Sequence, residues 1–517
     1  MKAALSVLIA IVAWEVVGDL HLVGQGALPS PSAIGLQRWQ DREIYPPHIW
    51  ATLKPALIGF VAGNCIAVAA ALAFVLVPGL ERLMRGFNVA VFGIPPIALS
   101  PVLVITLPGI YPQIALAAVA VYFPTMVMTL LGLQDIDPRP IDVIRSYGGG
   151  PLAVLRWLRL RSCLPGLLGG LRVAAPAAIL GAILAEFGSG ARWGLGSFLL
   201  GSLGRGDPAR IWGIGLAATI MSATAYGLCA LLARRSAASM TAVTIASGRI
   251  EAKAAGSGRS RARRALLSVA ALLVPFMIWW GVLKVFDISP VIAKTPWGVW
   301  QYLVSEPTAA DARGEILQAL QQSLPLAGCG LIIALALALA LAVAVNQWRD
   351  LGAMLMPAAL FLQTMPLVAL APIIVLLFGR GIEATVVITV TVTFFPALIT
   401  IAQGLSQVPP ASLDLLAVYG ARRWQKLLLI SLPMSLPYLC AAARLTAPAA
   451  LLGVMIAEWL ATGYGLGGLL NTARGELDYG MIWAVAFIAV AASVGFYQLV
   501  KLIEERLLDR YQVTAGR

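Results

Sequence analysis

A series of twelve long apolar segments constrains this chain more than any other feature. Each is close to or above the ~20 residues that a helix needs to cross the hydrocarbon core of a bilayer. Hydrophobic residues make up 60% of the 517 residues and charged residues only 12%, against about 45–50% and about 25% in soluble domains. The sequence therefore predicts an all-α integral membrane protein of about twelve transmembrane helices. We place them at residues 2–20, 53–78, 87–107, 111–133, 167–186, 209–233, 265–286, 323–346, 352–378, 382–404, 437–459 and 478–502.

The net charge of +13 comes largely from short basic loops between these segments. Such loops are typical of the cytoplasmic side of a membrane protein and do not indicate nucleic-acid binding. We interpret residues 236–264 as a basic cytoplasmic linker, and six crossings on either side of it then return both termini to the cytoplasm. The loops at 81–86, 134–165, 348–350 and 406–437 fall on the same side. Segments 21–50 and 287–320 are expected outside.

The two halves of the chain are repeats of one another. Gly132 and Gly404 differ by 272 positions (404 − 132), and the same offset relates further pairs over some sixty residues: Phe123 and Phe395, Pro138 and Pro410, Asp142 and Asp414, Tyr147 and Tyr419, Arg172 and Arg444, and Glu186 and Glu458. An even number of crossings per repeat makes the copies parallel. We therefore divide the chain into a first transmembrane domain at 1–235, the linker at 236–264, and a second transmembrane domain at 265–517.

A long loop between the fourth and fifth segments of each half carries the clearest motif. The second loop reads LDLLAVYGARRWQKLLLISLPMSLP from Leu413 to Pro437. It resembles the cytoplasmic "EAA" loop of binding-protein-dependent ABC transporter permeases, whose pattern is E-A-A-x3-G-x9-I-x-L-P. The matching positions are Asp414, Tyr419, Gly420, Ile430, Leu432 and Pro433 in the second loop, and Asp142, Tyr147 and Gly148 in the first.

The two loops depart from the pattern to different degrees. In the first, Leu158, Leu160 and Arg161 stand where the I-x-L-P ending is expected, and Gly148 is followed by two more glycines. Glycine weakens a helix interior by about 0.5–1 kcal/mol relative to alanine, whereas proline stops a helix sharply. We therefore expect the second loop to hold its helix more firmly and to dominate coupling.

Further motifs indicate the subgroup. PPIALSP begins at Pro95 and MPLVALAP at Met365, and a Gly-Leu-Gly follows each Ala-Glu at the end of the fifth segment. Together they resemble permeases of the nitrate, sulfonate and taurine group, here as a tandem fusion of two copies with the type I ABC importer architecture. The resemblance implies a multi-pass protein of the bacterial cytoplasmic membrane. Its partners would be two ABC ATPase subunits, an extracytoplasmic solute-binding protein and the lipid bilayer, with no nucleic acid. The substrate would be a small anion or a small heterocycle.

The chain is expected to form the translocation pathway without being an enzyme. It contains no GxxxxGK[ST] phosphate-binding loop, so ATP hydrolysis is assigned to separate subunits. No cofactor or metal site is expected. Glu186 and Glu458 lie ~29 Å along their helices, near the outer face. We expect their carboxylates to reach water in a structural role, with a gate or a binding-protein contact as the alternative.

A twelve-helix secondary transporter of the major-facilitator type is the alternative function. Such proteins also have parallel halves and a basic central loop, and the segment Gly79–Gly86 stands where they carry a Gly- and Arg-containing loop. The counterpart at Asn346–Ala353 does not match, and this alternative does not explain the two long loops. A membrane enzyme is less well supported, because no His, Asp or Glu cluster has ligand or triad spacing.

Topology can be tested by labelling single cysteines placed in a variant that lacks the five native ones. A cysteine at Ser257 and cysteines near either terminus should react only after the membrane is made permeable. Cysteines in segments 21–50 and 287–320 should react from outside in intact cells. Labelling of position 257 from outside would contradict the duplicated six-span topology.

Overall fold

The computed structural model describes residues 2–22, 26–234, 261–285, 287–363 and 367–510, and this part of the chain is helical with no β-strand. Most of the predicted linker therefore lies outside the described residues. Eight helices within them are long and apolar enough to cross a membrane. They correspond to the second, fourth, fifth and sixth predicted spans of each half: α3 (Tyr45–Leu76), α6 (Tyr111–Gln134), α10 (Leu164–Ser189), α12 (Pro208–Arg234), α16 (Ala309–Gln347), α19 (Ile382–Ser406), the continuous helix of α21 (Arg423–Lys426), η3 (Leu427–Ser431), α22 (Leu432–Ala457) and η4 (Glu458–Thr462), and α24 (Tyr479–Arg510).

The third predicted span of the first half is a bent pair of helices rather than one rod. α4 (Pro78–Gly93) and α5 (Pro96–Thr106) meet at 96°. Ile94 and Pro95 each precede a proline, which disfavours the helical conformation, and both are extended. In the second half α17 (Arg349–Gln363) and α18 (Leu367–Phe378) occupy the corresponding place, and the residues between them are not described.

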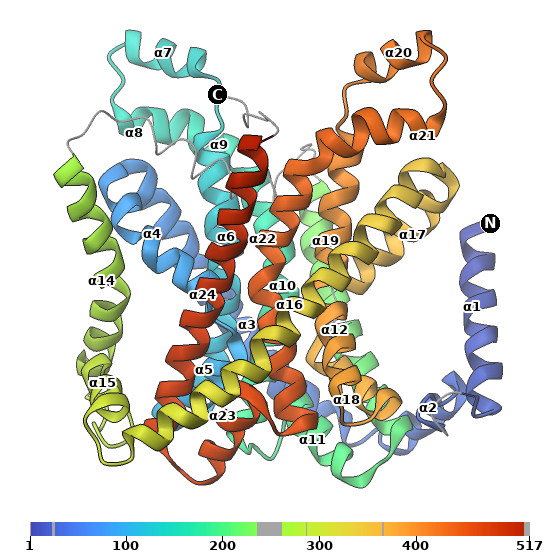
Figure 1. Ribbon diagram of the computed structural model, residues 1–517, viewed down its shortest axis with the longest axis vertical. Helices are drawn as coiled ribbons and strands as arrows, with labels where there is room; N and C mark the ends of the chain where they lie inside the picture. The colour runs from blue at the N-terminus through green and yellow to red at the C-terminus, as the bar shows by residue number, and fades with distance from the viewer. Residues whose placement is uncertain (1, 23–25, 235–260, 286, 364–366, 511–517) are drawn as a thin grey trace.

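The first span of each half stands at the edge of the molecule. α1 (Lys2–Asp19) and α14 (Arg261–Val285) lie at opposite sides in Figure 1. α14 belongs to the second half but packs against α4 of the first half. The two halves are therefore interlaced, and α12 packs against α18 as a further contact between them.

Two spans begin well before the apolar segments predicted for them. α3 starts at Tyr45 instead of residue 53, and α16 starts at Ala309 instead of residue 323. At 1.5 Å per residue the 39 residues of α16 extend about 58 Å, far more than a ~30 Å hydrocarbon core. α16 accordingly runs obliquely across the molecule (Figure 1), and its polar first turns belong to the end away from the chain termini.

Glycines bring three spans together in each half. An added Cβ at Gly59 of α3 would lie 2.6 Å from the Ala117 Cβ of α6, and one at Gly181 of α10 would lie 2.9 Å from the Ala117 Cα. In the second half Gly330 and Gly453 approach Thr389 in the same way. Small residues permit this close helix packing, which stabilises membrane bundles through van der Waals contacts.

Short helices at the end opposite the two long loops are tied to the last span of each half. α2 (Pro31–Gln40) ends at Asp41, whose carboxylate accepts two hydrogen bonds of 2.7 Å from the Arg210 guanidinium of α12. Burial alone would raise the pKa of Asp41, but the hydrogen bonds from Arg210 and Gln37 outweigh it and hold the pKa below its usual value. In the second half the Tyr302 hydroxyl of α15 (Pro296–Val304) donates to Asp478, just before α24.

The Gly59→Ala substitution tests this packing. The added methyl group would be forced against Ala117 and the Ile114 carbonyl oxygen, 2.6 Å away, so α3 and α6 must move apart. Overpacking of this kind costs about 1–3 kcal/mol. We expect a lower melting temperature for the purified protein in nanodiscs. Gly227→Ala is the control, because a Cβ there meets nothing within 4 Å; an equal shift in both variants would contradict the packing argument.

Candidate functional site

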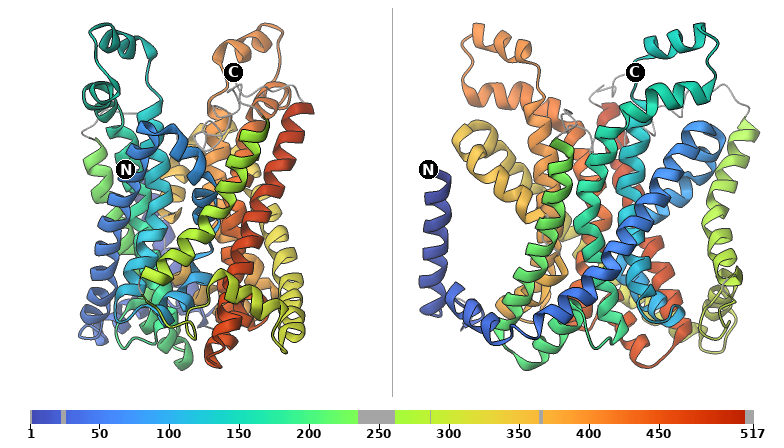
Figure 2. Two further views of the ribbon diagram at one scale, coloured as in Figure 1. Left: turned by 90° about the vertical axis from the view of Figure 1, so that its left-hand side faces the viewer. Right: turned by 180° about the vertical axis from the view of Figure 1, so that it is seen from behind.

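The two predicted loops fold into helical hairpins that project from the same end of the molecule (Figures 1 and 2). The first consists of α7 (Pro138–Ser146), α8 (Pro151–Val154), η2 (Leu155–Arg159) and α9 (Leu160–Ser162). The second consists of α20 (Pro410–Val418), followed by α21 and η3. The C-terminal end of α24 and the start of α14 lie at this end as well.

Gly148 and Gly420 have the same conformational role in the two loops. Each follows a nine-residue helix and has a positive φ, +78° and +71°. In the first loop the Gly148 and Gly149 amides donate to the carbonyls of Arg145 and Ile144, and in the second the Gly420 and Ala421 amides donate to those of Ala417 and Leu416. This is the Schellman pattern of helix termination, in which glycine avoids the steric cost of a left-handed residue. The glycine of the motif is thus explained by the sharp turn after α7 and α20.

The structure corrects the physical basis on which the two loops were expected to differ. The glycines at 148–150 lie between α7 and α8, so they interrupt no helix interior, and α7 is as long as α20. Pro433 stands in the first turn of α22, within a continuous helix from Arg423 to Thr462, and therefore does not stop a helix. Ile430 and Leu432 belong to the same continuous helix.

The tips of both loops expose apolar side chains. Tyr147 and Tyr419 are 89% and 81% exposed, and Val418 beside the latter is 85% exposed. Asp142 and Asp414 are exposed on α7 and α20. Further exposed apolar residues of the two loops are Val143, Leu152, Trp157, Leu415 and Trp424. Apolar side chains gathered on a projecting surface indicate a protein-binding site.

The base of each loop is anchored in the hydrophobic core. Leu155 packs against a cluster that contains Leu133, and Leu427 is buried in the corresponding cluster with Leu405. Leu155 and Leu427 are 272 residues apart, as are Leu133 and Leu405. Leu155 and Leu427 each begin a five-residue π-helical turn. The base of each loop is thus packed onto the spans from which the loop projects.

At the opposite end, Glu186 is a buried acid that organises a turn. Its side chain accepts hydrogen bonds from the Thr52 hydroxyl (2.6 Å) and the Gly196 amide (2.6 Å), and Thr52 accepts one from the Leu195 amide (2.8 Å). Only 1% of Glu186 is exposed. The carboxylate and the Thr52 hydroxyl thus each satisfy one backbone amide at the start of α11 (Leu195–Arg205).

Glu458 forms the same arrangement in the second half. It accepts hydrogen bonds from the Ser323 hydroxyl (2.7 Å) and the Gly467 amide (2.9 Å), and Ser323 accepts one from the Leu466 amide (2.9 Å). The turn leads into α23 (Gly465–Gly475). The expectation that Glu186 and Glu458 reach water is therefore wrong. Their carboxylates accept hydrogen bonds from backbone amides that would otherwise need water as the acceptor.

The hydroxyl partners were missed in the sequence. Thr52 and Ser323 are separated by 271 positions (323 − 52), the offset that also relates Gly194 to Gly465, so the repeat could have revealed them. Within the described residues, His, Cys, Asp and Glu form no group of three that could hold a metal.

The comparison with known proteins identifies the class to which these paired loops and duplicated spans belong. The chain is a member of the family described as binding-protein-dependent transport system inner membrane component, which it matches twice, at residues 63–241 and 317–509. The double match confirms the tandem duplication and decides against a major-facilitator transporter.

Three of the relatives are each about half the size of this chain. A probable ABC transporter permease of Haemophilus influenzae is 28% identical over 249 residues, which cover 98% of that protein but 48% of this chain. The riboflavin transport system permease of Chloroflexus aurantiacus is 33% identical over 166 residues, 62% of its length and 32% of this chain. The taurine transport system permease of Escherichia coli is 26% identical over 238 residues, 85% of its length and 45% of this chain.

A double-mutant cycle tests the arrangement around Glu186. Thr52→Val leaves the Leu195 amide and one Glu186 oxygen without this partner, and Glu186→Gln places an NH2 donor against either the Gly196 amide or the Thr52 hydroxyl. Each should lower the free energy of unfolding by about 1–3 kcal/mol. Because the two side chains share one network, we expect a coupling of about 0.5–3 kcal/mol between them in thermal unfolding.

Thr224→Val serves as the control for this cycle, because the Thr224 hydroxyl is exposed and donates to the Ile220 carbonyl of its own helix. It should change the melting temperature little. Purely additive effects of Thr52→Val and Glu186→Gln would show that the two groups do not act as one network.

Proposed function

We propose that this chain is the transmembrane permease subunit of an ABC importer, with both halves of the translocation pathway on one polypeptide. The observation that carries the proposal is the pair of core-anchored loops, each presenting an exposed tyrosine at the same end of the molecule. Family membership supports the class.

In this proposal each loop couples the spans to one ATPase subunit. The exposed apolar side chains around Tyr147 and Tyr419 insert into a groove of the partner, as amphipathic helices commonly do. Motion of the partner is passed to the spans on which each loop is based, because Leu155 packs against residues of α3 and α6, and Leu427 against residues of α16, α19 and α22. Asp142, Gly148, Asp414, Gly420, Ile430, Leu432 and Pro433 shape and anchor these loops.

Two loops on one chain imply two ATPase subunits for each copy of the protein. The proposed orientation places the loops, the linker and both termini in the cytoplasm of a bacterium. An extracytoplasmic binding protein then docks at the other end, beside α11 and α23. Glu186 and Glu458 act on a gate there indirectly, by fixing the turns that lead into these two helices.

The proposed substrate is a small anion or a small heterocycle. The names of two relatives refer to taurine, which carries a sulfonate group, and to riboflavin, which contains a fused heterocycle.

Substitutions at the two loop glycines test the coupling. A side chain at a positive φ costs roughly 1–2 kcal/mol and distorts the turn after α7 or α20. Since both glycines have the same geometry, Gly148→Val and Gly420→Val should each reduce the stimulation of ATP hydrolysis by the binding protein severalfold in proteoliposomes.

Gly150→Ala provides a control within the first loop. Its φ is −79° and a Cβ there meets nothing within 4 Å, so stimulation should be nearly unchanged. Full stimulation in both valine variants would overturn the coupling role of the loops. A loss at Gly420 alone would restore the asymmetry expected from the sequence.

A further inference from the structure

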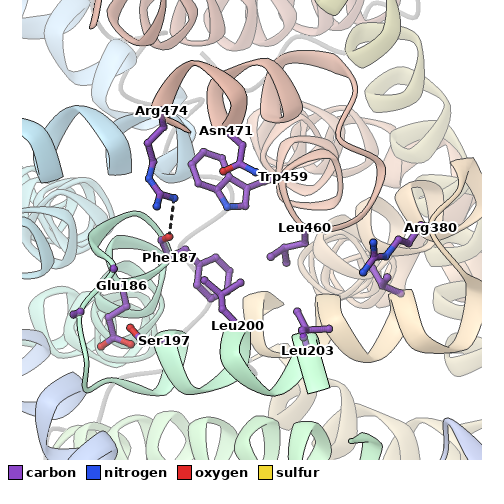
Figure 3. Close-up of a pocket in the computed structure, with 14 residues that line it drawn as sticks. Glu186, Phe187, Ser197, Leu200, Leu203, Arg380, Trp459, Leu460, Asn471 and Arg474 are labelled. Atoms are coloured by element: carbon purple, nitrogen blue, oxygen red, sulfur yellow. Dashed lines mark hydrogen bonds between the residues drawn. The ribbon is translucent and has the colours of Figure 1, made fainter. Parts of the chain in front are cut away.

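A cavity of about 420 Å³ lies between the two halves, at the end opposite the coupling loops. Its walls come from the ends of α10 and α18, from η4, and from the short helices α11 and α23 (Figure 3). Its volume falls in the range of small-molecule sites, about 300–1,000 Å³.

The repeat relates the two walls residue by residue. Phe187 and Trp459 follow the paired glutamates at the offset of 272. After the Gly-Leu-Gly turns the offset is 271 (465 − 194), which pairs Leu200 with Asn471 and Leu203 with Arg474. The equivalent hydrogen bonds of Glu186 and Glu458 to Gly196 and Gly467 confirm this register. All six paired side chains line the cavity.

Two of these three pairs differ in polarity, since Leu200 is matched by Asn471 and Leu203 by Arg474, whereas the third pair is aromatic on both walls. The first-half wall presents Phe187, Leu200 and Leu203, whereas the second-half wall presents Trp459, Asn471 and Arg474. Arg380 adds a second cation to the second-half wall, where the first half has Pro108 at the offset of 272. A symmetric pair of identical chains could not build such a cavity, because its two walls would be the same.

The charged groups of the cavity favour an anion on one side. The Arg474 guanidinium donates to the Phe187 carbonyl (3.3 Å) and lies 5.8 Å from the centre of the Trp459 ring. Arg380 is exposed. The acid of the lining, Glu186, is directed to Thr52 and Gly196 of its own half, so it does not neutralise the arginines directly.

We propose that this cavity is a polarised binding site for a small solute with an anionic group and a planar or apolar body. The anionic group faces Asn471 and Arg474, and the body lies against Phe187, Leu200 and Leu203. This proposal rests on the proposed function, because it makes the cavity the point at which a solute first enters the permease. The chain would thereby add a chemical selection to that of the binding protein.

Benzoate and benzamide are suitable probes, because they share a ring and differ in charge. Binding to the full chain in complex with its ATPase subunits, in nanodiscs, is measured by ligand-observed saturation-transfer NMR. We expect benzoate to bind at least tenfold more tightly than benzamide. Arg474→Leu, which installs the residue of the first-half wall, should weaken benzoate binding at least tenfold, and Arg474→Lys should retain it within about threefold.

Arg192→Leu is the matched control, because Arg192 lies at the same end and stacks on Trp193 but does not line the cavity. Benzoate binding should be unchanged in it. The proposal is overturned if benzoate does not bind the native complex, if benzamide binds equally well, or if Arg474→Leu binds benzoate like the native protein. A melting temperature for each variant separates loss of the site from loss of the fold.

The proposed function is measured in parallel on the native complex, as stimulation of ATP hydrolysis by the binding protein. Normal stimulation without benzoate binding would refute the polarised site and leave the permease function standing. Absent stimulation would refute the proposed function itself, whatever the binding result.

Discussion

The hydrocarbon core of the bilayer offers no partner to a backbone amide or carbonyl, and the architecture follows from this constraint. Helices satisfy these groups internally, so they form the spans. Where the backbone leaves the helical conformation, the protein must provide the missing partners. At the starts of α11 and α23 the buried carboxylates of Glu186 and Glu458 do so, each together with a hydroxyl from a distant span. These acids are thus structural acceptors for backbone amides.

Close packing is the second requirement, since apolar side chains gain little by leaving lipid for protein. The contacts of Gly59 and Gly181 with Ala117 hold α3, α6 and α10 together, and Gly330, Gly453 and Thr389 repeat them. Both the acids and the glycines occur in the two halves at corresponding positions. Duplication has therefore kept the framework, while several side chains facing the cavity between the halves have diverged.

Hydropathy and the repeat were enough to predict the main spans, the two loops and the parallel duplication. Hydropathy could not predict the early start of α16, because residues 309–322 are helical but polar. The environment of Glu186 depends on Thr52, which is 134 positions away. The position of Glu186 along its own helix therefore led to the wrong expectation that its carboxylate reaches water. The consecutive prolines, Pro95 and Pro96, indicate the bend at Ile94–Pro95, but a hydropathy window averages over them and does not detect it. The opposing walls of the cavity required the two halves to be placed together.

The packing of α14 on α4 has a consequence for biosynthesis. α14 is made after the whole first half, yet it packs on α4 of that half. During synthesis the face of α4 that contacts α14 therefore faces lipid or the insertion machinery until the linker and α14 have been translated. Once α14 packs on α4, the two halves of the same molecule are held together. Pairing with a half from another copy is thereby disfavoured, and the different chemistry of the two cavity walls is preserved in every molecule that matures.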